Sequence, residues 1–135
     1  MNGLLPDKLN TYDKRDRREE SGMLTITDRG SGDIVILDLE GQIDGGPKSE
    51  RIHELIKEGI QKGQKKFVLN LGEVKWLNSL GAGVLIAAYA SAKRENATLK
   101  LHSVTDRVGS VLKTCGLIPE VFDVYENEEE ALSSF

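Results

Sequence analysis

From residue 34 onward, short apolar runs alternate with longer segments in which apolar residues recur at helical spacing. The runs at residues 66–71 and 98–102 have the length of strands, whereas residues 47–62 and 79–96 have the length and spacing of helices. Strands that alternate with helices need crossover connections, and crossovers join parallel strands. The alternation therefore predicts an α/β fold with a largely parallel sheet.

The chain opens differently, with two strand-like runs and no helix between them. Residues 24–27 alternate apolar and polar side chains, residues 34–39 are mainly apolar, and RGSGD (residues 29–33) is typical of a turn. Such a short connection favours an antiparallel hairpin. A third helix after Thr105, a short strand near residues 121–125 and a last helix from about Asn127 complete the pattern. We expect a mixed, mostly parallel sheet with an opening hairpin and about four helices packed mainly on one face.

Length and charge narrow the range of functions. The 135 residues correspond to one domain, which we place at residues 23–135, after a charged and mobile tail at residues 1–22. A net charge of −4 argues against a nucleic-acid-binding protein. The longest apolar run, residues 84–90, is too short to insert into a membrane, and no secretory signal is recognisable. We therefore expect a cytoplasmic protein.

Two glycine-rich stretches resemble nucleotide-binding loops only in part. In residues 41–49, Pro47 separates Gly46 from Lys48 and so breaks the spacing of a phosphate-binding P-loop. In residues 81–83, the third small residue of a dinucleotide-binding fingerprint is missing at the required position. Neither stretch predicts a nucleotide cofactor.

The residues that most often carry catalysis or bind metals are also poorly placed. His53 and His102 have no metal-ligand spacing, and we expect both to be partly exposed structural residues. Cys115 lies on the apolar stripe of the third helix, where a small buried side chain is expected. Ser79, which stands between Asn78 and Leu80, does not lie in the Gly-x-Ser-x-Gly sequence of a nucleophile elbow. We expect no enzymatic activity, no metal and no cofactor.

The sequence WLNSLGAG (residues 76–83) joins a predicted strand to the predicted helix at residues 79–96. Ser79 has two roles open to it: it can accept a first-turn N–H as the N-cap, or it can carry a phosphate at the positive end of the helix dipole. Gly81 and Gly83 each cost the helix about 1 kcal/mol relative to alanine. Because glycine lets another backbone approach closely, the pair indicates a docking surface.

Three stretches of the sequence form a combined pattern: VILDLEGQIDGG (residues 35–46), KFVLNLGEVKWLNSLGAGVLIAAYASAKRENATLKL (residues 66–101) and TDRVGSVLKTCGLIPEVFDVYENEEEAL (residues 105–132). Together they resemble the STAS domain of bacterial anti-sigma factor antagonists. The resemblance covers about residues 23–135 and implies the STAS fold.

The resemblance also implies a binding switch. In this family the unphosphorylated antagonist binds an anti-sigma factor that is also a serine kinase, and so frees a sigma factor. Phosphorylation of a loop serine separates the pair, and a PP2C-type phosphatase restores the serine. The phosphorylated position falls on Ser79. Asn78 stands in place of the family's acid and Leu80 in place of a hydroxyl residue, which leaves Ser79 as the single acceptor of the loop.

The same resemblance implies which residues contact the partner. The acidic residue of the second-strand loop corresponds to Asp44, and the predicted partner-binding set is Asp44, Gly45, Asn78, Leu80, Gly81, Ala82 and Gly83. Two alternatives remain open. The chain could be a STAS subunit or scaffold of a membrane transport complex, such as an ABC-type lipid transporter, or a STAS module that senses a nucleotide or another small ligand.

Overall fold

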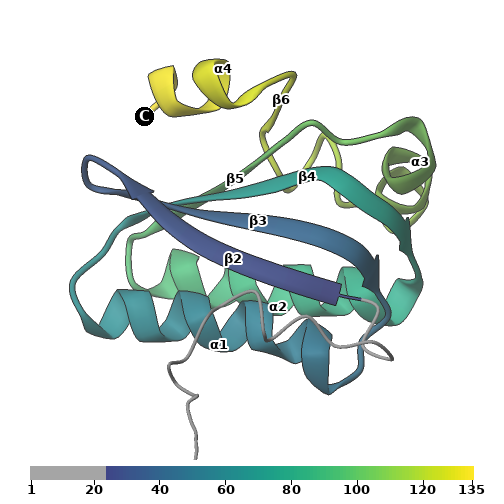
Figure 1. The fold of residues 1–135 in the computed structure, drawn as a ribbon, viewed down its shortest axis with the longest axis horizontal. Coiled ribbons are helices and arrows are strands. Elements are labelled where there is room, and N and C mark those ends of the chain that lie inside the picture. Colours follow the sequence, from purple (N-terminus) through teal and green to yellow (C-terminus); the bar gives the residue numbers. More distant parts are fainter. Residues whose placement is uncertain (1–23) are drawn as a thin grey trace, which may run out of the picture.

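The computed structural model describes residues 24–135, which form a five-stranded sheet and four helices (Figure 1). The charged tail expected at residues 1–22 and the domain start expected at Met23 lie outside these residues. Among the described helices, none has both the length and the apolar character needed to cross a membrane.

The strands are β2 (Leu24–Ser31), β3 (Ile34–Ile43), β4 (Lys66–Leu77), β5 (Thr98–His102) and β6 (Val124–Tyr125), and they follow this order across the sheet. β2 and β3 form an antiparallel hairpin, and every other neighbouring pair is parallel. The helices are α1 (Pro47–Gln61), α2 (Ser79–Arg94), α3 (Asp106–Thr114) and α4 (Glu128–Ser133). The predicted α/β fold, with its opening hairpin and its otherwise parallel strands, is confirmed.

One face of the sheet carries the main core. α1 and α2 lie side by side along this face (Figure 1) and α3 joins the same core. Alternate residues of the strands point toward these helices because successive side chains of a strand face opposite sides. The core includes Leu37, Leu39, Phe67, Leu69 and Leu101 from the strands, and Ile52, Ile56, Leu85, Val108 and Leu112 from the helices.

The opposite face is covered by α4 alone among the described helices (Figure 1). Ala131 of α4 packs against Ile34, Ile36 and Val68, and these four residues form a small second cluster. The expectation that the helices pack mainly on one face is therefore confirmed, with the last helix as the exception.

Several element ends differ from the sequence-based expectation. β4 was expected to end at residue 71 but continues to Leu77, and β3 continues to Ile43, where the two strands still pair. Only Val74 and Leu77 are buried in the added part of β4. Gly72 and the charged residues Glu73 and Lys75 interrupt the apolar run, so the sequence pattern placed the strand end too early. β6 is shorter than expected because residues 118–121 form a turn.

Two single-residue expectations were wrong. Cys115 is exposed rather than buried, because α3 ends at Thr114 and Cys115 is its C-cap. His102 is buried rather than partly exposed, with 3% of its surface accessible, because it points to the face that α4 covers. His53 is partly exposed as expected, and its Nε2 lies 2.7 Å from Ser91 Oγ, which joins α1 to α2.

Candidate functional site

Two loops meet where the neighbouring parallel strands β3 and β4 end. Ile43 and Leu77, the last residues of these strands, are paired, so the segments that follow them leave the sheet at the same edge. The Asn78 N–H donates to the Ile43 carbonyl oxygen over 3.3 Å. The loop at residues 44–46 and the start of α2 are therefore neighbours, although 35 positions separate Asp44 from Ser79 in the sequence.

Gly45 and Leu80 are the closest contact between the two loops. A Cβ atom on Gly45 would lie 2.5 Å from Leu80 Cβ, and Gly45 has a φ of 87°, a conformation that other residues rarely adopt. Glycine is thus needed at position 45 for two reasons: it can adopt the positive φ, and it has no side chain that would collide with Leu80. The structure brings together the residues that the sequence predicted as one site: Asp44, Gly45, Asn78, Ser79, Leu80, Gly81, Ala82 and Gly83.

Asn78, and not Ser79, is the N-cap of α2. Its side-chain Oδ1 accepts a hydrogen bond from the Gly81 N–H at 2.8 Å, and its carbonyl accepts the Ala82 N–H at 2.9 Å. Of the two roles open to Ser79, that of N-cap is therefore filled by Asn78, because asparagine is as good an N-cap as serine and lies one position earlier. Ser79 is the first helical residue.

The Ser79 hydroxyl is consequently not needed for the helix start. Ser79 is exposed, and its hydroxyl has no hydrogen bond to any residue between 24 and 135. It lies in the first turn of α2, where N–H groups without helical partners make the surroundings favourable for a negative charge. Ser79 is therefore an exposed residue at the first position of a helix.

The two glycines of the site have different surroundings. A Cβ atom on Gly81 would lie 2.0 Å from the Ile43 carbonyl oxygen, so the backbone that approaches Gly81 belongs to β3 of the same chain. A Cβ atom on Gly83 would meet no described atom within 4 Å, and Gly83 is exposed. Gly81 and Ala82 are buried, so only the exposed members of the predicted set can contact another protein directly.

The outer surface of α2 is apolar near Ser79. Leu80 is 69% exposed and Ile86 is 41% exposed, and the exposed residues Gly83 and Ala90 lie on the same side of the helix. The first charged residue of α2 is Lys93, in its last turn. An exposed helix side with this composition is typical of a surface that contacts another molecule.

Ser49 organises the loop beside Ser79, and sequence reasoning missed it. The Ser49 Oγ accepts the N–H groups of Asp44 and Gly45 at 3.0 and 3.2 Å, and its hydroxyl lies 3.2 Å from the Asp44 carboxylate as a donor. Asp44 Oδ1 also accepts the Gly46 N–H at 2.9 Å. Asp44 therefore shapes its own loop. The position of Ser49, two residues after Pro47 at the start of α1, was the sequence signal that could have indicated this role.

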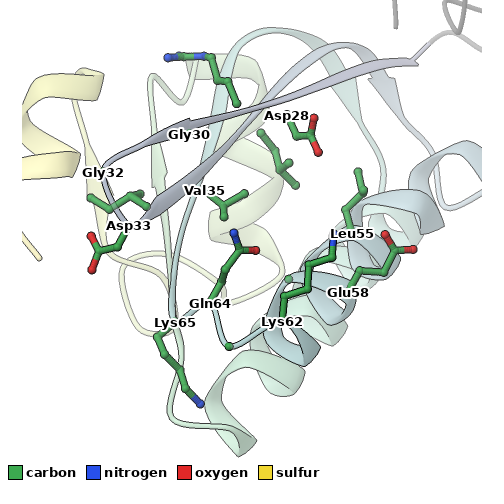
Figure 2. A pocket seen from close by; sticks show the side chains of 15 residues that line it. Asp28, Gly30, Gly32, Asp33, Val35, Leu55, Glu58, Lys62, Gln64 and Lys65 are labelled. Atoms are coloured by element: carbon green, nitrogen blue, oxygen red, sulfur yellow. The ribbon is translucent and has the colours of Figure 1, made fainter. Parts of the chain in front are cut away.

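A hollow of about 470 Å³ lies at the opposite end of β3, between the β2–β3 hairpin and the C-terminal end of α1. Figure 2 shows Leu55 and Glu58 of α1, with Lys62 just after the helix, on one side of it and Asp28 of β2 on the other. Residues 44–46 and 78–83 do not line this hollow. It is therefore separate from the predicted site.

The sequence model of the STAS domain family matches residues 25–131. The chain belongs to the STAS domain family. STAS proteins of the antagonist type are not enzymes, in agreement with the expectation from the sequence.

Individual relatives are more distant. The chain is similar to the anti-sigma F factor antagonist of Paenibacillus polymyxa, with 27% identity over 101 residues, which cover 74% of this chain and 85% of that protein. It shares its fold with an anti-sigma factor antagonist from Mycobacterium paratuberculosis, with a TM-score of 0.72 and 17% identity over 86% of this chain and 97% of the other. The Bacillus cell fate determinant SpoIIAA in its phosphorylated form has a TM-score of 0.64 and 20% identity, over 81% of this chain and 97% of that one.

Proposed function

We propose that this chain is an anti-sigma factor antagonist that is controlled by phosphorylation of Ser79. Its unphosphorylated form binds an anti-sigma factor with serine kinase activity through the exposed surface around Ser79, and so frees a sigma factor. Phosphorylation ends this binding, and a PP2C-type phosphatase restores it. The observation that carries the proposal is that Asn78 caps α2, which leaves the exposed Ser79 hydroxyl available for modification.

The surroundings of Ser79 support a switch of this kind. A phosphate would add about −1.5 to −2 charges beside the apolar side chains of Leu80 and Ile86, where a docked partner would remove water from it. The same phosphate is compatible with the free protein, because the N-terminal end of a helix favours negative charge. A loss of roughly 3 kcal/mol in the binding free energy would weaken binding more than a hundredfold.

The names of the relatives support an anti-sigma factor as the class of partner. The curated relative from Paenibacillus is named as an antagonist of an anti-sigma F factor, and SpoIIAA is described in a phosphorylated form. In this chain, Leu80 leaves Ser79 as the acceptor, and Asn78 provides the N-cap without adding a charge beside it.

Incubation with the candidate kinase and ATP, followed by phosphosite mapping, tests the proposal. We expect label on Ser79, no label on the Ser79→Ala variant, and normal labelling of a Ser110→Ala variant, which changes an exposed serine of α3. Ser79→Ala should capture the kinase constitutively, whereas Ser79→Asp should weaken capture more than a hundredfold. Label on a different residue, or none, would contradict the proposal.

The alternatives predict other results in the same preparations. Co-purification with a permease and its ATPase, independent of the residue at position 79, would indicate a transport subunit. A thermal shift caused by a nucleotide would indicate a ligand sensor.

A further inference from the structure

A row of polar side chains crosses the face of the sheet that α4 covers. Asp38 of β3, Asn70 of β4 and His102 of β5 are paired in register, so their side chains share this face. Asn70 Nδ2 donates to Asp38 Oδ1 over 2.8 Å, and Arg29 of β2 binds Asp38 with its Nε 2.6 Å from Oδ2. The row ends at His102, beside the first turn of α4.

We assign the neutral tautomer of His102 from the hydrogen bonds of its neighbour Ser103. The Ser103 hydroxyl donates to the Glu126 carbonyl over 3.3 Å, and Ser103 Oγ lies 2.8 Å from His102 Nδ1. With its own proton engaged, Ser103 Oγ acts as acceptor, so Nδ1 carries the proton of the ring. Nε2 is then a lone-pair acceptor. It is buried and has no hydrogen-bond partner among the described residues.

Glu128, the first residue of α4, faces this lone pair. Its Oε1 lies 3.9 Å from His102 Nε2, beyond hydrogen-bond distance. Both oxygens of Glu128 are bound by the Arg29 guanidinium, Oε2 at 3.2 Å from Nη1 and Oε1 by Nη2. Arg29 thus binds Asp38 and Glu128 at the same time. The Glu128 carboxylate, which faces His102, is therefore already paired with the Arg29 guanidinium.

The remaining contacts of α4 with the sheet come from its second half, where Leu132 and the following Phe135 also pack against the small cluster. Ala131 fills the small cluster with Ile34, Ile36 and Val68, and the Lys100 ammonium donates to the Ser134 carbonyl and hydroxyl at 3.1 and 2.7 Å. Helix α4 has six residues, too few to be stable without the sheet. A change at His102 therefore acts on a weakly held element.

Protonation of His102 conflicts with this arrangement. A proton on Nε2 would bury a positive charge that has no hydrogen bond, with the Arg29 cation nearby. Burial lowers the pKa of His102, and the attraction of Glu128 and Asp38 does not compensate for it. Release of α4 would move Glu128 away from His102 and give the imidazolium access to water.

We propose that His102 makes the docking of α4 on the sheet dependent on pH: a neutral imidazole keeps the helix in place, and protonation of Nε2 releases it. The charged or titratable groups on this face include Arg29 from β2, Asp38 from β3, Lys66 from β4, Lys100 from β5, Tyr125 from β6 and Glu128 from α4. His102 is the group among them whose ordinary titration range lies between pH 5 and 8.

Hydrogen exchange of the full chain, followed by NMR between pH 7.5 and 5, tests this coupling. The Ala131 amide, which donates to the Asn127 carbonyl, reports on α4, and the Ala88 amide reports on α2. After correction for the intrinsic exchange rate, opening at Ala131 should increase about tenfold per pH unit below about 6.5, while Ala88 should not follow. His102→Asn keeps a donor near the Nδ1 position and cannot be protonated, so its α4 should lose this pH dependence.

Two matched variants separate His102 from other groups. His53→Asn changes the second histidine of the chain and should retain the pH dependence of Ala131. Glu128→Gln removes the facing carboxylate and keeps His102, so it should also retain it. If α4 of the His102→Asn variant is undocked at every pH, the proposal is tested on the unchanged chain instead. There, the midpoint of the His102 ring titration, measured by NMR, must coincide with the loss of protection at Ala131. Protection that is constant or rises toward pH 5, or a pH dependence that disappears in Glu128→Gln, would overturn the proposal.

Discussion

Gly81 and Gly83 lie in the first turns of α2, two positions apart, and alanine should have opposite effects at them. At Gly81 the added methyl would meet the Ile43 carbonyl oxygen at 2.0 Å, which forces α2 away from β3 and should destabilise the protein by about 1–3 kcal/mol or more. At Gly83 the methyl would meet no described atom, so the higher helix propensity of alanine should stabilise it by about 1 kcal/mol.

Urea unfolding of the two alanine variants measures this difference directly, with each variant as the control of the other. A Gly81→Ala variant as stable as the unchanged chain would mean that α2 and β3 are not in close contact. A Gly83→Ala variant that is clearly destabilised would mean that the outer side of α2 is covered by another part of the molecule.

At the scale of single residues, the sequence pointed to the right site but not to each residue's role. The motif Asn78-Ser79 offers two adjacent N-cap residues, and local propensity does not choose between them. The atom that excludes a side chain at Gly81 belongs to Ile43, 38 positions earlier. A sequence motif shows that glycine is present at position 81. The reason why glycine is needed there is a contact that only the packing of α2 on β3 creates.

At the scale of elements, hydrophobic periodicity predicted the order of strands and helices and failed at their ends. β4 extends six residues beyond the predicted residue 71, to Leu77, because backbone pairing with β3 continues beyond Gly72, where the continuous apolar run has ended. The exposed Cys115 has the same origin, since α3 ends before the apolar stripe does. Strand ends depend on pairing partners, which a local pattern does not contain.

The loop between β3 and α1 depends on one buried side chain, Ser49. Replacement by alanine would leave the N–H groups of Asp44 and Gly45 without their acceptor, and a buried unsatisfied donor costs about 1–3 kcal/mol. We expect Ser49→Ala to be destabilised by this amount and to show faster hydrogen exchange at Asp44 and Gly45.

Ser110→Ala, an exposed serine of α3, is the control for this prediction and should change neither quantity. Because Gly45 touches Leu80, the loosened loop should also weaken any binding at Ser79 while leaving the Ser79 hydroxyl in place. Unchanged exchange at Asp44 and Gly45 in Ser49→Ala would show that this serine does not hold the loop.

At the scale of the whole molecule, the parallel sheet determines which distant segments become neighbours. The site at residues 44–46 and 78–83 could be expected from the sequence, because loops after adjacent parallel strands leave the same edge of a sheet. The cluster around His102 could not, because Arg29 and Glu128 are 99 positions apart and meet only when α4 covers the second face. Nothing in the local sequence of either residue indicates the other.

The pH dependence of folding follows from groups on both sides of the sheet. Burial lowers the pKa of His53, with Lys57 adding to this effect, and burial also lowers the pKa of His102. A histidine whose folded pKa is below its unfolded value binds a proton more readily in the unfolded chain. Its contribution to stability is complete above about pH 6.5 and is lost as the pH falls through the folded pKa.

Asp38 acts in a second, more acidic range. Burial raises the pKa of Asp38, but hydrogen bonds from Arg29 and Asn70 lower it further than burial raises it, so the net pKa is below 3.8. The contribution of Asp38 to stability is present above about pH 4 and disappears as the pH falls through the lowered pKa.

The free energy of unfolding, measured with urea from pH 7.5 to 2.5, should therefore decrease in two separate steps. The double variant His53→Asn/His102→Asn should lose the first step and keep the second. The Asp38→Asn variant should keep the first step and lose the second. A single step below pH 4 in the unchanged chain would contradict the assignment of the first step to the histidines.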